Sequence, residues 1–115
     1  MEEFERIIYV SHPFQDRMSN LRAIEKIIMS LKKEYPTYLF VSPSHTFSFE
    51  YTVAPYEIGL QECYWMLSKC DECWVFGDWE NSTGCRAEIE YCRSHNIPLR
   101  IRTGYEKIAE EGLHE

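Results

Sequence analysis

The chain has 115 residues, the size of one domain and enough to form a hydrophobic core. Its formal net charge is −7 and no basic stripe is visible, which excludes a protein that grips duplex nucleic acid through its phosphates. The five cysteines, the absence of a signal peptide and the absence of a long apolar run predict one cytoplasmic domain, residues 1–115, with free thiols and no membrane segment.

The first third of the chain predicts a strand followed by a helix. Residues 6–11, RIIYVS, form a short β-rich run that a His-Pro pair ends, as expected for a buried strand. Ser19 and Asn20 can cap the next segment, whose apolar side chains recur at helical spacing. Pro36 marks the end of that helix.

The middle of the chain predicts a second strand, a loop and a second helix. Residues 37–42, TYLFVS, form the strand, and a proline follows it. Residues 44–51 are polar and aromatic without a clear period, which favours a surface loop of the kind that carries function at strand ends. The pattern from 54 to 69 is helical, with Leu60 and Leu67 on one stripe.

The last third repeats the alternation. Residues 72–77 predict a strand, 84–95 a helix and 97–102 a further strand. Thr103 followed by Glu106 resembles a capping box, which predicts a short last helix ending near residue 112.

Strands that alternate with amphipathic helices predict an α/β fold. We expect a three-layer α/β/α sandwich of the Rossmann-like kind, with a parallel sheet of four or five strands covered on both faces. Ligands bind such sheets beyond the carboxyl ends of the strands. Here those ends are 11–14, 42–43 and 77–79.

A carboxylate stands on the inner face of the helix predicted at 84–95. Arg86, Glu90 and Arg93 have the spacing of solvent-side ion pairs, and Glu88 lies roughly opposite them. A charge on that face costs free energy unless it is paired or faces a polar cavity. Two interpretations stay open: a carboxyl that hydrogen-bonds a neighbouring loop, or an ionised nucleophile beside a ligand.

The start of the same helix favours a ligand. Ser82 or Asn81 can cap it, and Gly84 lets a ligand approach the backbone closely. The first free N–H groups of a helix attract an anion and weakly favour an ionised Glu88.

Other chemistry-bearing residues give weaker signals. Cys70 and Cys73 have the spacing of a metal-binding pair, but a structural zinc site needs a second pair, so we predict core thiols, no metal and no cofactor. Tyr9, Phe14 and Trp79 can stack on a base or pack in the core or an interface.

Three stretches together resemble the nucleoside 2-deoxyribosyltransferase-like superfamily, in particular its small phage and bacterial members. They are the strand end 9–14, YVSHPF; the pair Cys70-Asp71; and Trp-x-x-Ser-x-Gly-x-x-x-Glu at 79–88. The resemblance spans about residues 6–102.

The resemblance implies a function and a set of site residues. It implies an N-glycosidase (a hydrolase) or a deoxyribosyltransferase acting on nucleosides or their 5′-monophosphates, in which Glu88 attacks the anomeric carbon and Ser82 contacts the sugar or its phosphate. Further implications are a nucleoside or nucleotide as partner, a homo-oligomer whose sites neighbouring subunits complete, and the cytoplasm of a bacterial or phage-infected cell. The predicted substrate-binding residues are Tyr9, Ser11, His12, Pro13, Phe14, Asp78, Trp79, Ser82 and Gly84.

One position departs from the resemblance. Active relatives carry an aspartate eight residues before the Asp that ends the preceding helix, and here that position is Cys63. Glu62 is adjacent but points about 100° away on a helix, and the other groups that could supply an acid are Asp78, Glu57 and His12.

This departure keeps two other classes open. One is a non-catalytic binder that sequesters or senses a nucleotide derivative. The other is a phage interaction protein with a vestigial pocket, which a pocket plugged by Trp79 and Phe14 would indicate.

Overall fold

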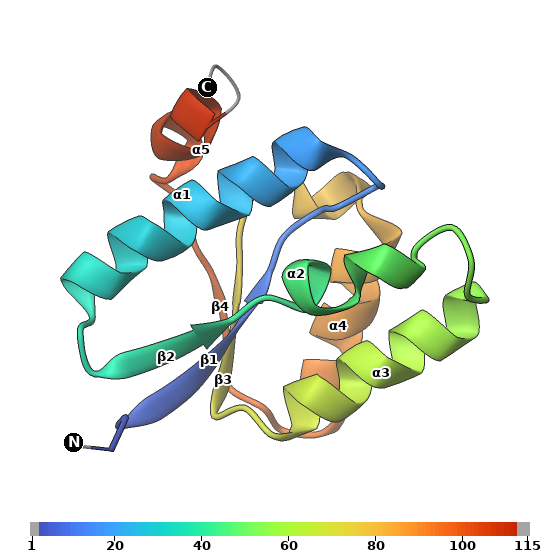
Figure 1. The fold of residues 1–115 in the computed structure, drawn as a ribbon. Coiled ribbons are helices and arrows are strands. Elements are labelled where there is room, and N and C mark those ends of the chain that lie inside the picture. The colour runs from blue at the N-terminus through green and yellow to red at the C-terminus, as the bar shows by residue number, and fades with distance from the viewer. Residues whose placement is uncertain (1–2, 113–115) are drawn as a thin grey trace.

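The computed structural model describes residues 3–112, and within them it confirms the predicted fold class. Four parallel strands form one sheet in the order β2-β1-β3-β4 (Figure 1). The strands are β1 (Arg6–Ser11), β2 (Tyr38–Val41), β3 (Glu72–Val75) and β4 (Leu99–Ile101). The first strand has the predicted bounds, whereas the other three are shorter than their apolar runs.

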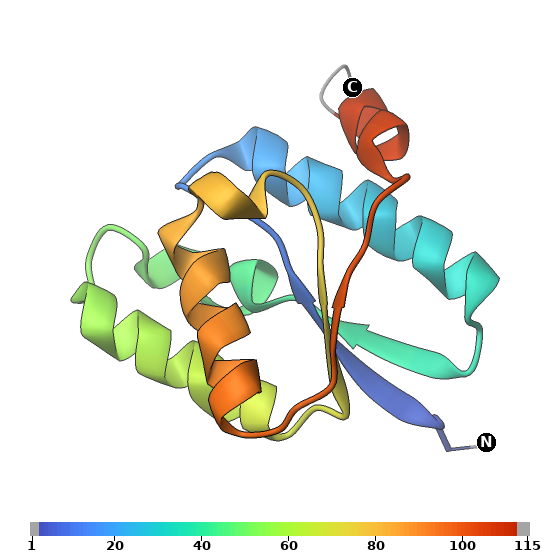
Figure 2. The same ribbon diagram turned by 180° about the vertical axis from the view of Figure 1, so that it is seen from behind.

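Helices cover both faces of the sheet, which makes three layers (Figures 1 and 2). The α-helices α1 and α5 pack together on one face, and α3 and α4 pack together on the other. The helical elements are α1 (Met18–Glu34), α2 (Pro43–Phe47), η1 (Ser48–Glu50), α3 (Tyr56–Ser68), η2 (Trp79–Asn81), α4 (Thr83–Ser94) and α5 (Glu106–Gly112). No helix within residues 3–112 is both long and apolar enough to cross a bilayer.

Successive side chains of β1 point to opposite faces and enter two separate cores. Ile8 and Val10 pack under α1, together with the buried Trp74. Tyr9 points the other way, into the cluster beneath α3 and α4. The alternation therefore directs one aromatic hydroxyl of the central strand toward the helix that carries Glu88.

Two local predictions were wrong. Residues 44–51 are largely helical rather than a loop, because Pro43 favours a first helical turn and the Ser42 hydroxyl accepts from the His45 N–H at 3.3 Å. The α1 helix starts at Met18 after Arg17, and no side chain caps it. Instead of capping, the Asn20 amide donates to the carbonyl of Phe14 at 2.7 Å and ties the loop after β1 to the helix.

The cysteines agree with the expectation of free thiols. All five are unpaired, and Cys73, Cys85 and Cys92 are buried in the core. Asp71, the second residue of the quoted Cys-Asp pair, accepts from the Ile7 N–H at 2.7 Å and so fastens the turn before β3 to the start of β1.

Candidate functional site

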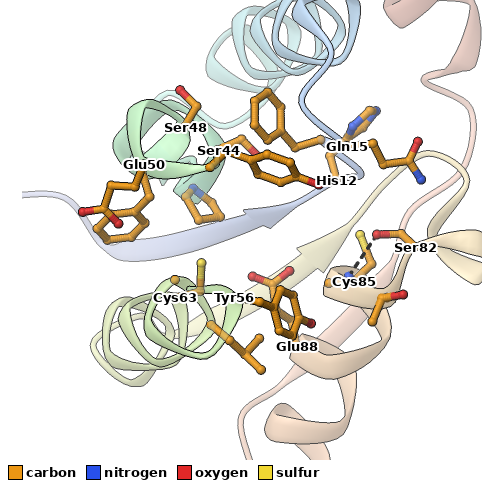
Figure 3. Close-up of a pocket in the computed structure, with 18 of the residues that line it drawn as sticks. His12, Gln15, Ser44, Ser48, Glu50, Tyr56, Cys63, Ser82, Cys85 and Glu88 are labelled. Carbon is orange, nitrogen blue, oxygen red and sulfur yellow. Dashed lines mark hydrogen bonds between the residues drawn. The ribbon is translucent and has the colours of Figure 1, made fainter. Parts of the chain in front are cut away.

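A cavity of about 500 Å³ opens at the carboxyl edge of the sheet. It lies between the α2–α3 segment and the start of α4, with residues from the end of β1 closing one side (Figure 3). His12 follows β1, Ser44 follows β2 and Ser82 follows β3, and all three line it. The cavity is therefore where a parallel sheet is expected to bind a ligand.

Glu88 lines this cavity from the second turn of α4 (Figure 3). Its residue is only 6% exposed. The Tyr9 hydroxyl donates to one carboxyl oxygen, and the Ser11 hydroxyl donates to the other at 2.8 Å. Both partners come from the central strand, so the sheet fixes the orientation of the carboxyl group.

Burial controls the ionisation of Glu88. It raises the pKa of this carboxyl to about 7, although the hydrogen bonds from Tyr9 and Ser11 act to lower it. The same burial, together with the charge of Glu88, raises the pKa of Tyr9, so the phenol remains a neutral donor. Near neutral pH the Glu88 carboxyl therefore populates both its protonated and its ionised form, as is common for groups that act in catalysis.

The start of α4 forms another side of the site. The Ser82 hydroxyl accepts from the Cys85 N–H at 3.2 Å and caps the helix, as predicted (Figure 3). A side chain at Gly84 would meet nothing closer than the Ser82 hydroxyl at 4.0 Å. The backbone here is thus open to a ligand.

His12 lies on the cavity wall as a neutral ring. Its Nδ1 carries a proton, because it is 2.7 Å from the carbonyl oxygen of Pro13, which can only accept. Burial lowers the pKa of His12. The ring packs against Gly77, whose φ is +73°, and a Cβ there would be 2.8 Å from Nε2. A neutral His12 is a poor candidate for the general acid that the resemblance requires, which would protonate the departing nucleobase.

The structure brings only some of the predicted residues to the cavity. Those that line it are His12, Phe14, Ser82, Gly84 and Glu88. Tyr9 and Ser11 do not line the cavity, but both donate hydrogen bonds to Glu88, which does. Pro13 is buried beside it, and its carbonyl faces His12. Asp78 is exposed and accepts from the Asn81 amide at 2.9 and 3.0 Å. Trp79 packs against the core cluster that contains Tyr9.

An aromatic wall was missed by the sequence analysis. Phe47, Tyr51 and Tyr56, from the α2–α3 segment, line the cavity, and the Phe14 ring meets the Tyr51 ring edge to face at 5.1 Å between centroids. The one signal was the density of aromatic residues in a segment without a period. Aromatic faces of this kind can stack on a flat ligand.

Cys63 also lines the cavity, on α3. Burial, and then the charge of Glu88, raise the pKa of its thiol to about 12. At the position where the resemblance implies an aspartate, the side chain is therefore a protonated thiol at neutral pH. It does not replace a carboxylic acid.

Comparison with known proteins places the chain in a family. Residues 6–102 match a family described as a domain of unknown function, DUF7768, and the chain belongs to that family. The matched region contains the whole sheet and the cavity. No curated protein and no solved structure matches the chain significantly.

Proposed function

We propose that the cavity binds a nucleoside and that Glu88 cleaves or transfers its N-glycosidic bond as a nucleophile. One observation carries the proposal: a buried carboxyl at the carboxyl edge of a parallel sheet, held by two hydroxyls and facing a ligand-sized cavity. The resemblance of residues 79–88 to nucleoside 2-deoxyribosyltransferase-like proteins supports the same chemistry.

The mechanism follows from the geometry around Glu88. Hydroxyl donors on both oxygens fix the carboxylate in one orientation, and a restricted orientation favours attack on an anomeric carbon. Attack forms an ester between Glu88 and the sugar as the base leaves, and water or a second base then displaces Glu88. The aromatic wall is placed to stack on the base.

The charges around the cavity favour an unphosphorylated substrate. Two glutamates, Glu50 and Glu88, line it, whereas no lysine or arginine does so among residues 3–112. The N-termini of α3 and α4 also line it and attract an anion, but only with the partial charge of a helix end. We therefore expect nucleosides to bind better than their 5′-monophosphates, whose second ionisation repels the carboxylates.

The test measures base release and binding in parallel. The protein is incubated with a panel of deoxyribonucleosides and their 5′-monophosphates, free base is followed by chromatography, and thermal stabilisation is recorded with the same ligands. Glu88→Ala and Glu88→Gln are compared with Glu90→Gln, a matched control that removes an exposed carboxyl from the same helix. Base release by the wild type and the control, but not by the Glu88 variants, supports the proposal. Equal release by all four refutes it.

A non-catalytic binder is the second candidate, and Cys63 favours it. A thiol with a pKa of about 12 stands where active relatives carry an aspartate. Thermal stabilisation by nucleosides without release of base, retained in Glu88→Ala, would support this candidate. A vestigial, plugged pocket is less well supported, because the cavity has a volume of about 500 Å³ and Trp79 packs in the core.

We also propose a homo-oligomer, as the resemblance implies. Apolar side chains stand exposed beside the cavity, and the most exposed are Phe49 at 75% and Val53 at 80%. Large apolar side chains that stand exposed within a few residues of each other favour an interaction surface. Sedimentation equilibrium of the wild type and of Val53→Asp tests this, and a monomeric wild type at micromolar concentration would refute it.

A further inference from the structure

A pair of carboxyl groups, one from η1 and one from α3, lies beside the cavity. Glu50 ends η1 and lines the cavity, and Glu62 is in the second turn of α3 (Figure 3 shows Glu50). Oε2 of Glu50 and Oε1 of Glu62 are both shielded from solvent, and neither meets a hydrogen-bond donor among residues 3–112. Only a proton held by the pair itself can therefore join the two groups.

The surroundings make the loss of that proton costly. A hydrogen bond with Glu50, followed by burial and the charge of Glu50, raises the pKa of Glu62. The charges of both Glu62 and Glu50 act on the Cys63 thiol of α3, whose pKa of about 12 keeps it neutral, so it offers the pair no compensating charge. Among residues 3–112 no lysine or arginine lines the cavity beside Glu50, so the pair retains one proton over a wider pH range than an isolated carboxyl does.

Glu50, the member of the pair that lines the cavity, faces the same space as Glu88. Both Glu50 and Glu88 line the cavity, and the charges of Glu88, Glu62 and Glu50 all act on the Cys63 thiol. In Figure 3 Cys63 is seen between Glu50 and Glu88. A ligand that places its sugar at Glu88 can thus direct its base toward Glu50. Glu88, with a pKa of about 7, is ionised in part of the population near neutral pH, and the pair holds a proton, so the cavity contains both a nucleophile and an acid.

We propose that Glu50 gives the proton to the departing base, and that Glu62 is a positioning residue that keeps this proton on the pair. The inference rests on the proposed function. It assigns to Glu50 the acid that Cys63 does not supply, from a different element of the fold.

The proposed step is balanced in atoms and electrons. A Glu88 carboxylate oxygen forms a bond to the anomeric carbon while the C–N glycosidic bond breaks, and its electron pair stays with the base. The proton of the pair passes through Glu50 to the base, which leaves neutral, and the pair is left doubly ionised. Water then attacks the anomeric carbon and releases the Glu88 carboxylate. The hydroxyl of this water goes to the sugar, and the other proton of the water returns to the pair.

The test compares two leaving groups. Natural deoxyribonucleosides need a proton on the departing base, whereas the nitrophenolate of a nitrophenyl 2-deoxyriboside leaves without one. Glu50→Gln should lose about 100- to 10,000-fold in kcat on the nucleoside, with much less loss on the aryl glycoside. Glu88→Gln should lose both activities, and the control Glu90→Gln should lose neither. Equal effects of Glu50→Gln on the two substrates, or no effect on either, would overturn the assignment of Glu50.

Glu62→Gln tests whether Glu62 holds the proton on the pair or only supports the fold. Its amide donates to Glu50 and favours the ionised carboxylate, so the pH above which nucleoside cleavage falls should move downward. The aryl glycoside should show no such shift. An unchanged pH profile would refute the role of Glu62.

A readout independent of activity completes the test. Carboxyl NMR of the ¹³C-glutamate-labelled protein should show one group that stays protonated at pH values where the other glutamates are ionised, besides Glu88, and this signal should be lost in Glu50→Gln. Ordinary titration of both carboxyls would overturn the inference even in an inactive protein. A wild type that releases nothing from either substrate would refute the proposed function itself, and with it the delivery of the proton by Glu50.

Discussion

The ionisation of Glu88 should make the protein less stable as the pH rises, and Glu88→Gln should remove this effect. The ordinary pKa of a glutamate carboxyl, which applies to the unfolded chain, is 4.5. In the folded protein the pKa of Glu88 is about 7, because burial disfavours the charge. Between these values the folded state binds more protons than the unfolded state. The free energy of unfolding of the wild type therefore falls as the pH rises through this interval.

The magnitude follows from the shift. Each pKa unit corresponds to roughly 1.4 kcal/mol, so the wild type should lose on the order of 3 kcal/mol relative to a permanently neutral side chain. Glu88→Gln has nearly the same shape and no charge. Its stability relative to the wild type should thus rise by on the order of 3 kcal/mol between pH 4.5 and pH 8, on top of any constant offset from altered hydrogen bonds.

Urea unfolding at several pH values measures this difference. Other titrating groups cancel when the variant is compared with the wild type at each pH, since distant sites act independently. The thiol of Cys63 does not interfere, because its pKa of about 12 lies above the measured range. Glu90→Gln, an exposed control on the same helix, should show little slope.

Two results would refute the reasoning. A difference between Glu88→Gln and the wild type that stays constant from pH 4.5 to pH 8 would mean that the pKa of the carboxyl is not raised in the folded protein. A difference of opposite slope below pH 4.5 would mean that the hydroxyls of Tyr9 and Ser11 outweigh burial and hold Glu88 ionised.

Three further predictions concern the frame of the site. Tyr9→Phe removes a donor to Glu88, so the pKa of that carboxyl should rise further and the protein should lose about 2 kcal/mol at pH 8, measured by urea unfolding; unchanged stability would contradict the hydrogen bond. Gly77→Ala should cost about 1–2 kcal/mol or more, because φ is +73° and a Cβ would lie 2.8 Å from a histidine nitrogen, whereas Gly59→Ala, with open space inside α3, should gain about 0.5–1 kcal/mol. A thermal melt compares the two, and equal effects would contradict the geometry. Ser82→Ala should cost about 1 kcal/mol through loss of the α4 cap, and a neutral result in the same assay would show that the cap contributes nothing.

Local patterns along the chain determined the architecture. The run 6–11 became β1 with its predicted bounds, and the alternation of apolar runs with amphipathic segments became a parallel sheet between two helical layers. Helical spacing also placed Glu88 on the inner face of its helix and Ser82 at its start. These features depend on residues that are neighbours in sequence, where periodicity and capping act directly.

Boundaries and caps were decided less locally. The strands after β1 are shorter than their apolar runs, because pairing with a neighbouring strand decides where a strand ends. Asn20 belongs to a residue type that often caps the N-terminus of a helix, but its amide donates to a carbonyl of the preceding loop instead. A polar side chain takes the partner that tertiary packing brings within reach.

Only the tertiary structure showed what surrounds Glu88. Tyr9 and Ser11 are 79 and 77 residues away in sequence, and they meet the carboxyl because the register of β1 beside β3 brings the central strand under α4. The Glu50–Glu62 pair likewise joins two helical segments whose contact no period predicts. The sequence by itself determined the layers and the helix face on which the carboxylate stands. Packing between distant segments decided its partners, its burial and therefore its pKa, because desolvation depends on every element that closes over a group.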